Sequence, residues 1–428
     1  MKYHSTNNPL IEATLQQAVF APLANDGGLY MPDNLPKIPK AFFNNLSAMT
    51  MPEIGYVVAN TLFGEDIDSR SLKEIIDYTF SFDIPIIQLE ENIYVMELFH
   101  GPTLAINDVS ARFMSRLVQY LSKKQAANKE IKILVATTGD TGSAIANAFY
   151  DVKGVTTYIL YPKDAINRLR TAQFTSLRGN VRPIEVAGSY TDCQQLVNQA
   201  LNDKELASHS IVTSGNSINI ARFIPQMFYC FFAYARMLDM LGAEKVNNHL
   251  VYSVPRGNLG NICSAIIAKR MGLPIKRLVA AAIEGDSFIN YSGVRKLTSD
   301  PNMQSNQARL LNLSENNKQQ MTEILSSYTF DDKKIAETIA DIDKRNGYTM
   351  SPKSAKAYLG LKETLKGNEI GVFIAPTHPV KFLDLVEKAV GHAVEIPAQI
   401  SQVMIGANNS KQIPATYSAL KRYLMTGK

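Results

Sequence analysis

From about residue 75 onward, short apolar runs rich in β-branched residues alternate with longer amphipathic stretches. This alternation is typical of strand–helix–strand units, in which helices cover the faces of a parallel sheet. A first series predicts strands at 131–136, 156–160 and 181–186, and helices at 143–150 and 192–201. A second series predicts strands at 249–254, 277–283 and 369–375, and a helix at 261–271. We therefore expect an α/β fold with open, mainly parallel sheets.

The chain has 428 residues, of which 46% are hydrophobic and 19% charged, so it is long enough to bury more than one core. Its first part is different in character, with a Gly- and Pro-rich stretch at 23–39 and a helical pattern at 51–63. We predict an N-terminal subdomain at 1–92, a first α/β domain at 93–217 and a second at 218–428. A polar stretch at 287–317 has no sustained period and predicts a surface insertion in the second domain.

Several classes of function are disfavoured by the composition. The formal charge of +5 comes from dispersed cations, so no nucleic-acid partner is expected. The N-terminus has no basic region followed by a long apolar core, and the most apolar run, 227–235, is too short to cross a bilayer. We expect a cytoplasmic protein in which 227–235 is a buried helix. Cys193, Cys230 and Cys263 are widely spaced, which predicts reduced thiols, and the six histidines lack metal-ligand spacing.

Two glycine-containing turns each stand between an expected strand and an expected helix. The first runs from Thr137 to Gly142 (TTGDTG) and the second from Arg256 to Gly260 (RGNLG). Backbone N–H groups and the helix dipole converge on an anion at such a turn. Neither turn matches a dinucleotide fingerprint or a Walker loop, so a small phosphate or carboxylate is the better ligand. Each turn alone is equally consistent with a tight connection in which glycine adopts positive φ.

Specific strings in a matching order carry a resemblance to the threonine synthase family. They include ELFHGPTLAINDVSARFM from Glu97, ATTGDTGSAIANAFYD from Ala136, NSINIARFIPQ from Asn216, SVPRGNLG from Ser253 and FIAPTHPVKF from Phe373. The resemblance covers most of the chain. It implies the fold type II architecture of pyridoxal-phosphate enzymes, with two α/β domains closing over a cleft, and it makes pyridoxal phosphate the expected cofactor. In that family the cofactor serves the conversion of O-phosphohomoserine to threonine and phosphate.

The family signature reads ELFHGPTLAFKDFGARFM, and its lysine holds the cofactor as a Schiff base. Asn107 occupies that position here. The amide lone pair of asparagine is delocalised into the carbonyl, so it is neither basic nor nucleophilic enough to form an imine. We therefore expect covalent attachment of the cofactor to be lost at this position.

Further departures fall in other site motifs of the family. Arg256 replaces a serine beside the expected phosphate loop, and Pro376 replaces the threonine that faces the pyridine nitrogen. Lys353 replaces a histidine, and Arg309 replaces an aspartate. Arg168 and Arg170 also add positive charge, and these additions suggest a new anion pocket.

The resemblance assigns roles to particular positions. The expected cofactor-binding residues are Arg256, Gly257, Asn258, Leu259, Gly260, Pro376 and Thr377. The expected substrate-binding residues are His100, Thr103, Thr138, Gly139, Asp140, Thr141, Gly142 and Asn216. From chemistry alone, His100 is equally a hydrogen-bonded core histidine and Asp140 an acid favoured by a helix N-terminus. Arg222 is expected to pair with an acidic residue rather than with a ligand.

We expect a threonine synthase-like protein that has lost the covalent cofactor link and binds a small anionic, phosphorylated or amino-acid-like, metabolite. One alternative is an active threonine synthase or related lyase, in which Lys353 or Lys381 replaces the missing lysine or the cofactor is held without a covalent link. Another is a partner subunit that stabilises an active paralogue, and an oligomer is possible. A substitution introduced at position 107 alone would leave the other departures unexplained.

Overall fold

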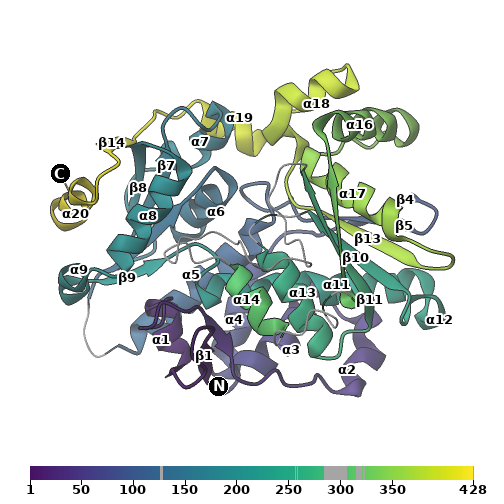
Figure 1. Ribbon diagram of the computed structural model, residues 1–428, viewed down its shortest axis with the longest axis horizontal. Helices are drawn as coiled ribbons and strands as arrows, with labels where there is room; N and C mark the ends of the chain where they lie inside the picture. Colours follow the sequence, from purple (N-terminus) through teal and green to yellow (C-terminus); the bar gives the residue numbers. More distant parts are fainter. Residues whose placement is uncertain are drawn as a thin grey trace.

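The computed structural model describes residues 1–125, 129–255, 257, 259–283, 306–314, 321 and 323–427. Three sheets organise this part of the chain, with the strand orders β2-β1-β3, β14-β8-β7-β6-β9 and β12-β11-β10-β13-β5-β4. Figure 1 shows the five-stranded sheet at the left, the six-stranded sheet at the right and the N-terminal elements below both. The expected α/β fold with open, mainly parallel sheets and an N-terminal subdomain is confirmed.

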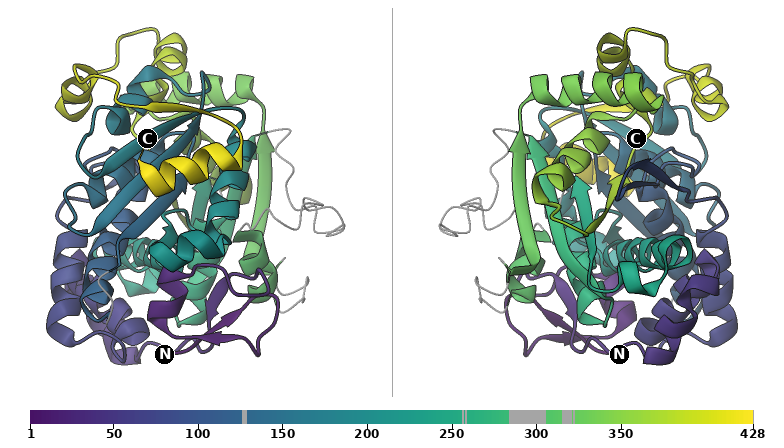
Figure 2. Two further views of the ribbon diagram at one scale, coloured as in Figure 1. Left: turned by 90° about the vertical axis from the view of Figure 1, so that its left-hand side faces the viewer. Right: turned by 90° about the vertical axis from the view of Figure 1, so that its right-hand side faces the viewer.

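The N-terminal elements form a small antiparallel sheet followed by helices. The strands are β1 (Tyr3–Ser5), β2 (Glu12–Ala13) and β3 (Tyr30–Pro32). The helices are α1 (Leu15–Phe20), α2 (Lys40–Asn45), η1 (Leu46–Ala48), α3 (Met51–Phe63) and α4 (Ser69–Thr79). α3 has the bounds expected from the sequence, because Thr50 and Glu53 form a capping box at its start. In both side views these elements form the base of the molecule (Figure 2).

The five-stranded sheet is entirely parallel. Its strands are β6 (Ile131–Ala136), β7 (Val155–Pro162), β8 (Val181–Ala187), β9 (Ile211–Ser214) and β14 (Lys411–Pro414). Its helices are α5 (Asn107–Lys123), α6 (Asp140–Phe149), α7 (Arg168–Thr175), α8 (Tyr190–Leu201), α9 (Lys204–His209) and α20 (Tyr417–Thr426). The three strands predicted in this region are present. They form because buried residues fill both faces, as in β6, where all six residues are buried and all but Lys132 are apolar.

The six-stranded sheet is parallel except for β4, which pairs antiparallel with β5. Its strands are β4 (Ile86–Glu90), β5 (Ile93–Glu97), β10 (Leu250–Pro255), β11 (Ile275–Ile283), β12 (Leu325–Phe330) and β13 (Ile370–Ala375). The helices that precede or cover it are α10 (Ile220–Phe223), η2 (Ile224–Met227), α11 (Phe228–Leu241), α12 (Ala243–Val246), α13 (Gly260–Arg270), α14 (Asn306–Leu313), α16 (Asp332–Asn346) and α17 (Pro352–Thr364). The C-terminal segment adds η3 (Pro379–Phe382), α18 (Leu383–Val390) and α19 (Ala398–Met404).

The sheets do not follow the contiguous division at 92/93 and 217/218. β5 begins just after the first boundary, but it pairs with β13 of the six-stranded sheet. β14 lies near the C-terminus, but it extends the five-stranded sheet beside β8. Strand pairing across long stretches of sequence therefore makes both α/β units discontinuous in the chain.

The expected surface insertion at 287–317 is wrong for the part that the structure describes. Residues 306–313 form α14, in which Asn306, Arg309, Leu310 and Leu313 are buried. The polar composition concealed this helix because its buried polar groups find hydrogen-bond partners in the tertiary structure. Residues 287–305 and 315–317 lie outside the described residues.

The expected buried helix and the expected reduced cysteines are both confirmed. The apolar run at 227–235 becomes α11, which is buried from Phe228 to Ala235. Cys193, Cys230 and Cys263 are free and buried. Among the described residues, no helix has the length and apolarity that a membrane span requires, and no group of three or more His, Cys, Asp or Glu side chains is arranged to hold a metal.

Candidate active site

The loop that leads to Asn107 is fastened to the end of β13. Backbone hydrogen bonds join Leu98 N to Ala375 O at 3.0 Å and Ile106 N to Pro376 O at 2.7 Å. A third joins His378 N to Leu104 O at 3.2 Å, and Leu104 adopts a left-handed φ of 57°. The loop therefore runs from β5 across the carboxyl end of β13 before α5 begins, which is the edge where open parallel sheets hold ligands.

Asn107 is the first residue of α5, and both its side chain and its backbone are engaged. Its Nδ2 donates to Thr141 Oγ1 at 3.1 Å, which connects α5 to the first turn of α6. Its carbonyl accepts a hydrogen bond from Arg222 Nη1 at 3.0 Å. The amide thus serves as a link between two helix N-termini.

Hydrogen bonds between Thr103 and Asp108 also hold this loop in place. Asp108 accepts hydrogen bonds from Thr103 N at 2.9 Å and from Thr103 Oγ1 at 2.6 Å. Burial raises the pKa of the Asp108 carboxyl, although the bonds from Thr103 counteract this shift. Gln173 Nε2 donates to the Thr103 carbonyl at 3.2 Å. The Thr103 hydroxyl, expected at the substrate, is buried and already bonded within the protein.

The first glycine turn pairs two of its backbone N–H groups with a side chain of the turn itself. Thr137 Oγ1 accepts hydrogen bonds from Gly139 N and Gly142 N, both at 2.9 Å. Gly139 has a φ of 132°, which strongly favours glycine. Thr138 is exposed at the tip of the turn, whereas Asp140 is buried as the first residue of α6. The charge at this helix N-terminus is therefore supplied by the protein's own carboxylate.

Within the described part of the chain, four side chains converge on Asp140, and three of them are cationic. Lys353 Nζ lies 2.7 Å from Oδ2, and Lys381 Nζ lies 3.1 Å from Oδ1. Arg170 Nη2 is 3.4 Å from Oδ1. Thr377 Oγ1 donates to Oδ2 at 3.2 Å and accepts from Lys353 Nζ at 3.3 Å. We call Asp140, Arg170, Lys353 and Lys381 the Asp140 cluster.

The electrostatics of the Asp140 cluster follow from burial and charge together. Burial alone would raise the pKa of the Asp140 carboxyl, but the charges of Lys353, Lys381 and Arg170 outweigh burial and hold this pKa well below its ordinary value. Lys381 is fully buried, and burial lowers the pKa of its ammonium group, although Asp140 partly offsets that shift. Among the described residues, three cationic groups contact Asp140, and Asp108 also acts electrostatically on Lys381, which still leaves an excess of positive charge.

The second glycine turn is described only in part. Arg256 and Asn258 lie outside the described residues. Gly257 has open space around its Cα, because an added Cβ would meet no atom within 4 Å. Leu259 adopts a left-handed φ of 64°, and Gly260 begins α13. Pro376 is buried, and its carbonyl is taken by Ile106.

Two histidines lie beside the Asn107 loop. His100 Nε2 is 2.6 Å from Glu97 Oε2, and Glu97 Oε1 also accepts from the Tyr348 hydroxyl at 2.8 Å. Burial lowers the pKa of His378 to about 4, so this imidazole is neutral near pH 7. The hydrogen bond considered for His100 is present, but His100 is exposed and is not a core histidine.

Other expected site residues hold the framework. The Asn216 side chain pairs with both backbone groups of Ala136, at 3.0 and 2.8 Å, and so secures the end of β6. Arg222 was expected to pair with an acidic residue, but among the described residues it donates to Asn107 O and to Ser110 Oγ at 2.8 Å.

Arg309, which the sequence placed among the changed site motifs, lies fully buried beneath the loop that follows β9. It donates to the carbonyls of Tyr30, Ser217 and Ile218, and its guanidinium stacks on Phe223 at 4.1 Å. Burial lowers its pKa to about 9. Its position connects α14 with β3, so it acts on the framework.

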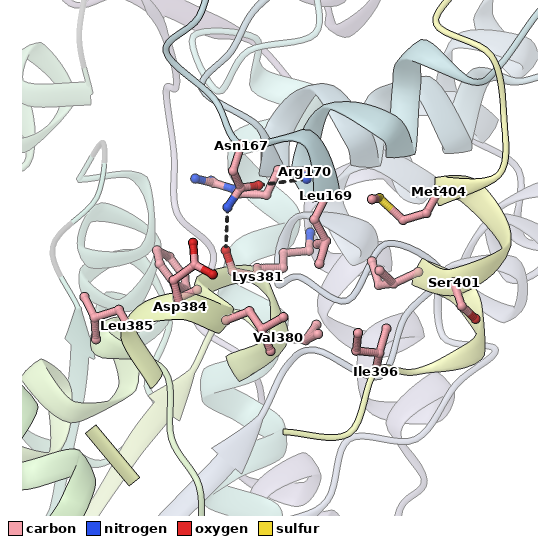
Figure 3. Close-up of a pocket in the computed structure, with 13 residues that line it drawn as sticks. Asn167, Leu169, Arg170, Val380, Lys381, Asp384, Leu385, Ile396, Ser401 and Met404 are labelled. Atoms are coloured by element: carbon pink, nitrogen blue, oxygen red, sulfur yellow. Dashed lines mark hydrogen bonds between the residues drawn. The ribbon is translucent and has the colours of Figure 1, made fainter. Parts of the chain in front are cut away.

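A cavity of ≈ 680 Å³ lies beside the Asp140 cluster (Figure 3). It is lined by residues of α7, of η3 and α18, and of the segment from Ile396 to Met404. Arg170 and Lys381 belong both to this lining and to the cluster. Figure 3 shows Asn167 donating to the Lys381 carbonyl, at 3.4 Å, where α7 meets η3. The sequence indicated the basic additions in α7, but it gave no signal for the cavity walls from α18 and α19.

Comparisons with known proteins agree with this architecture. Residues 2–80 match the family described as threonine synthase N terminus, and residues 82–376 match the pyridoxal-phosphate dependent enzymes. The chain is 31% identical to a threonine synthase from Escherichia coli strain K12, covering 99% of both chains, and 35% identical to one from Haemophilus influenzae, covering 99% of this chain and 100% of that one.

Solved structures show the same likeness. The crystal structure of the threonine synthase from Escherichia coli superposes with a TM-score of 0.91 over 100% of both chains, at 31% identity. The pyridoxal-phosphate-bound threonine synthase from Brucella melitensis gives a TM-score of 0.88 at 28% identity, over 99% of this chain and 98% of that one. Full-length similarity in both sequence and fold therefore shows that the chain belongs to the threonine synthase family of fold type II pyridoxal-phosphate enzymes.

Proposed function

We propose that this member of the threonine synthase family does not form the covalent lysine link to pyridoxal phosphate, and that it binds a small anionic metabolite at the Asp140 cluster. The observation that carries the proposal is Asn107 at the first position of α5, with its amide bonded to Thr141. An amide in this place supplies neither a nucleophile nor a base.

Pyridoxal phosphate is the cofactor that the family leads one to expect, and the described residues do not fit its covalently held form. No amine is present at position 107. At position 376, proline has no side-chain donor or acceptor for a pyridine nitrogen. The nearby lysines, Lys353 and Lys381, are both committed to Asp140.

The charge of the cluster supports an anionic ligand. Among the described residues, three cationic side chains contact the Asp140 carboxylate, so the site attracts further negative charge. The Lys353 side chain keeps 34% of its surface exposed, and a ligand can therefore reach it from solvent. Charge-assisted hydrogen bonds from Lys and Arg suit a phosphate or carboxylate group.

Borohydride trapping tests the absence of the covalent link. The purified protein is incubated with pyridoxal phosphate, reduced with sodium borohydride and measured by intact mass. We expect no stoichiometric adduct on wild type or on Asn107→Gln, and an adduct at position 107 on Asn107→Lys. A stoichiometric adduct on Lys353 or Lys381 of the wild type would contradict the proposal.

Calorimetric titration with inorganic phosphate tests the anion site. We expect saturable binding to the wild type and at least tenfold weaker binding to Lys353→Met, because that variant loses one cationic contact. The matched control is Lys333→Met, at an 85% exposed lysine of α16 outside the cluster, which should bind like the wild type. Equal binding to all three proteins would contradict the proposed site.

The position of Lys353 favours one second candidate, an active threonine synthase in which this lysine replaces the missing one. Its ammonium contacts Thr377, and Thr377 pairs with Ala105 in the loop before Asn107. Formation of threonine and phosphate from O-phosphohomoserine, lost in Lys353→Met, would establish this candidate. No product beside an active threonine synthase control would exclude it.

A further inference from the structure

The cavity beside the Asp140 cluster combines a charged end with apolar walls. Arg170 stands at the charged end, and Lys381, whose side chain is fully buried, also belongs to the lining. The apolar walls include Leu169, Val380, Leu383, Ile400 and Met404, which belong to one small apolar cluster. At ≈ 680 Å³ the cavity is within the range of pockets that hold small molecules, about 300–1,000 Å³.

The mouth of the cavity leaves apolar side chains in solvent. Leu385 is 42% exposed and Ile396 is 47% exposed, and both line the cavity. The adjoining Ile405 is 88% exposed. Apolar side chains gathered at a concave site mark a surface that gains free energy when an apolar group covers it.

The charged end favours an anion over a neutral or cationic group. Arg170 lies with its guanidinium 5.5 Å from the centre of the Phe382 ring, and Lys353 Nζ lies 5.5 Å from the same centre. Phe382 therefore joins the Asp140 cluster to the cavity. Asp384 is the acidic residue of the cavity lining, and it is exposed. Solvent screens that rim charge more than it screens the buried cluster.

From these features we propose that the cavity binds the apolar chain of an amphipathic anion, a carboxylate or phosphate monoester on a straight hydrocarbon chain, whose head group lies toward Arg170. This inference rests on the proposed anion site and adds the chemical class of its ligand. A compact amino-acid-like anion would fill the charged end and leave the apolar walls uncovered.

A homologous series measured by isothermal titration calorimetry tests the inference with the full-length protein. The probes are butanoate, hexanoate and octanoate, together with 1-hexanol and inorganic phosphate. Each methylene buried against the walls should strengthen binding about fourfold. 1-Hexanol should bind at least tenfold more weakly than hexanoate, because it lacks the charge. Equal affinity across the three carboxylates would overturn the inference, and if phosphate still bound, the proposed anion site would stand.

Variants at the mouth locate the binding. Leu385→Ser and Ile396→Ser should each weaken octanoate binding several-fold and leave phosphate binding unchanged. Met240→Ser is the matched control, because Met240 is 46% exposed on α11, away from the cavity lining. If all three variants weakened octanoate binding equally, the inference would be overturned. Light scattering gives a second test. A wild-type mass twice that of the monomer, lost in Leu385→Ser and Ile396→Ser, would also overturn the inference, because a second copy of the chain would then cover the mouth. Loss of both phosphate and octanoate binding in the wild type would instead reject the anion site itself.

Discussion

Asp140 is the residue on which the charges of the site depend. Its side chain is 8% exposed and pairs with the fully buried Lys381 and two further cations. Removing one partner of a buried ion pair leaves an uncompensated charge and typically costs about 3–5 kcal/mol. We therefore expect Asp140→Asn to lower the free energy of unfolding by about that amount, measured by chemical denaturation.

The control for Asp140→Asn is Asp239→Asn. Asp239 pairs with Arg236 on the surface of α11, where its side chain is 56% exposed, so its loss should cost about 0–1 kcal/mol. Phosphate should stabilise Asp140→Asn more than the wild type, because a bound anion then replaces the missing carboxylate. Equal losses for the two variants would show that the cluster does not depend on Asp140.

His378 gives the protein a defined response to acid. Burial lowers its pKa to about 4, below the ordinary value of about 6.5 for an unfolded chain. At pH values between about 4 and about 6.5, the imidazole binds a proton in the unfolded state but not in the folded state. The neutral imidazole therefore contributes stability that is present above about pH 6.5 and is lost as the pH falls toward 4.

The measurement is the free energy of unfolding at pH 7 and at pH 5. The His378 contribution should fall by about 2 kcal/mol over this interval. His378→Asn removes the titrating group and can still cap η3, where His378 Nδ1 now accepts from Val380 N at 3.2 Å. The variant should therefore lose less stability than the wild type on acidification. Parallel pH curves would indicate that His378 does not titrate in this way.

At the scale of elements, the start of α6 depends on close contact with α7. A Cβ added to Gly139 would lie 2.8 Å from Arg170 Nε, and the φ of 132° is itself unfavourable for other residues. Gly139→Ala should lower the free energy of unfolding by more than about 1 kcal/mol. It should also weaken phosphate binding, because it displaces a cation of the Asp140 cluster.

Gly154→Ala is the control that separates a steric clash with Arg170 from backbone strain as the cause of lost stability. The φ of Gly154 is 76°, and an added Cβ would meet nothing within 4 Å, so Gly154→Ala reports backbone strain without a steric clash. We expect the loss for Gly139→Ala to exceed that for Gly154→Ala, and Arg170→Ala to relieve part of the difference in a double-mutant cycle. If both alanine variants lost the same free energy of unfolding, a steric clash between α7 and the turn would not contribute to the loss.

The elements also show what the sequence could predict. Strands such as β6 and β13 were predictable because they are buried on both faces and therefore apolar, apart from Lys132 in β6. β12 was not predicted, because its LSSYTF sequence lies at an edge of the sheet and is only partly buried. α14 was missed because it buries polar residues that are satisfied by distant carbonyls.

The parts of the site that lie within a sequence motif could be predicted. The parts that form only when distant residues meet in the folded protein could not. The turn from Thr137 to Gly142 and the position of Asn107 were evident from the sequence. The convergence of Lys353 and Lys381 on Asp140 was not, because these partners are separated by 213 and 241 residues. The local sequence pattern around each residue carries no information about a contact between residues so far apart in the chain.

At the scale of the whole molecule, each large sheet has a separate apolar layer on its outer face. One layer packs α8 and α20 on the five-stranded sheet and includes Leu420. The other packs α16, α17 and α18 on the six-stranded sheet and includes Leu361. Figure 2 shows α20, in yellow, lying across the strands of the first sheet. A third, larger core joins the inner faces of both sheets to the N-terminal elements.

This arrangement predicts that damage to one outer layer stays local. Leu420 and Leu361 are both fully buried, and replacing either with alanine should cost about 2–5 kcal/mol. Measured by hydrogen exchange, Leu420→Ala should speed exchange in β7, β8, β14 and α20, and leave β10 and β13 protected. Leu361→Ala should do the reverse, because its layer contacts β5, β10 and β13. The two variants have the same chemistry and burial, so each controls for the other. If both variants speed exchange equally in both sheets, the shared inner core makes the molecule one cooperative unit, and the separate outer layers have no independent stability.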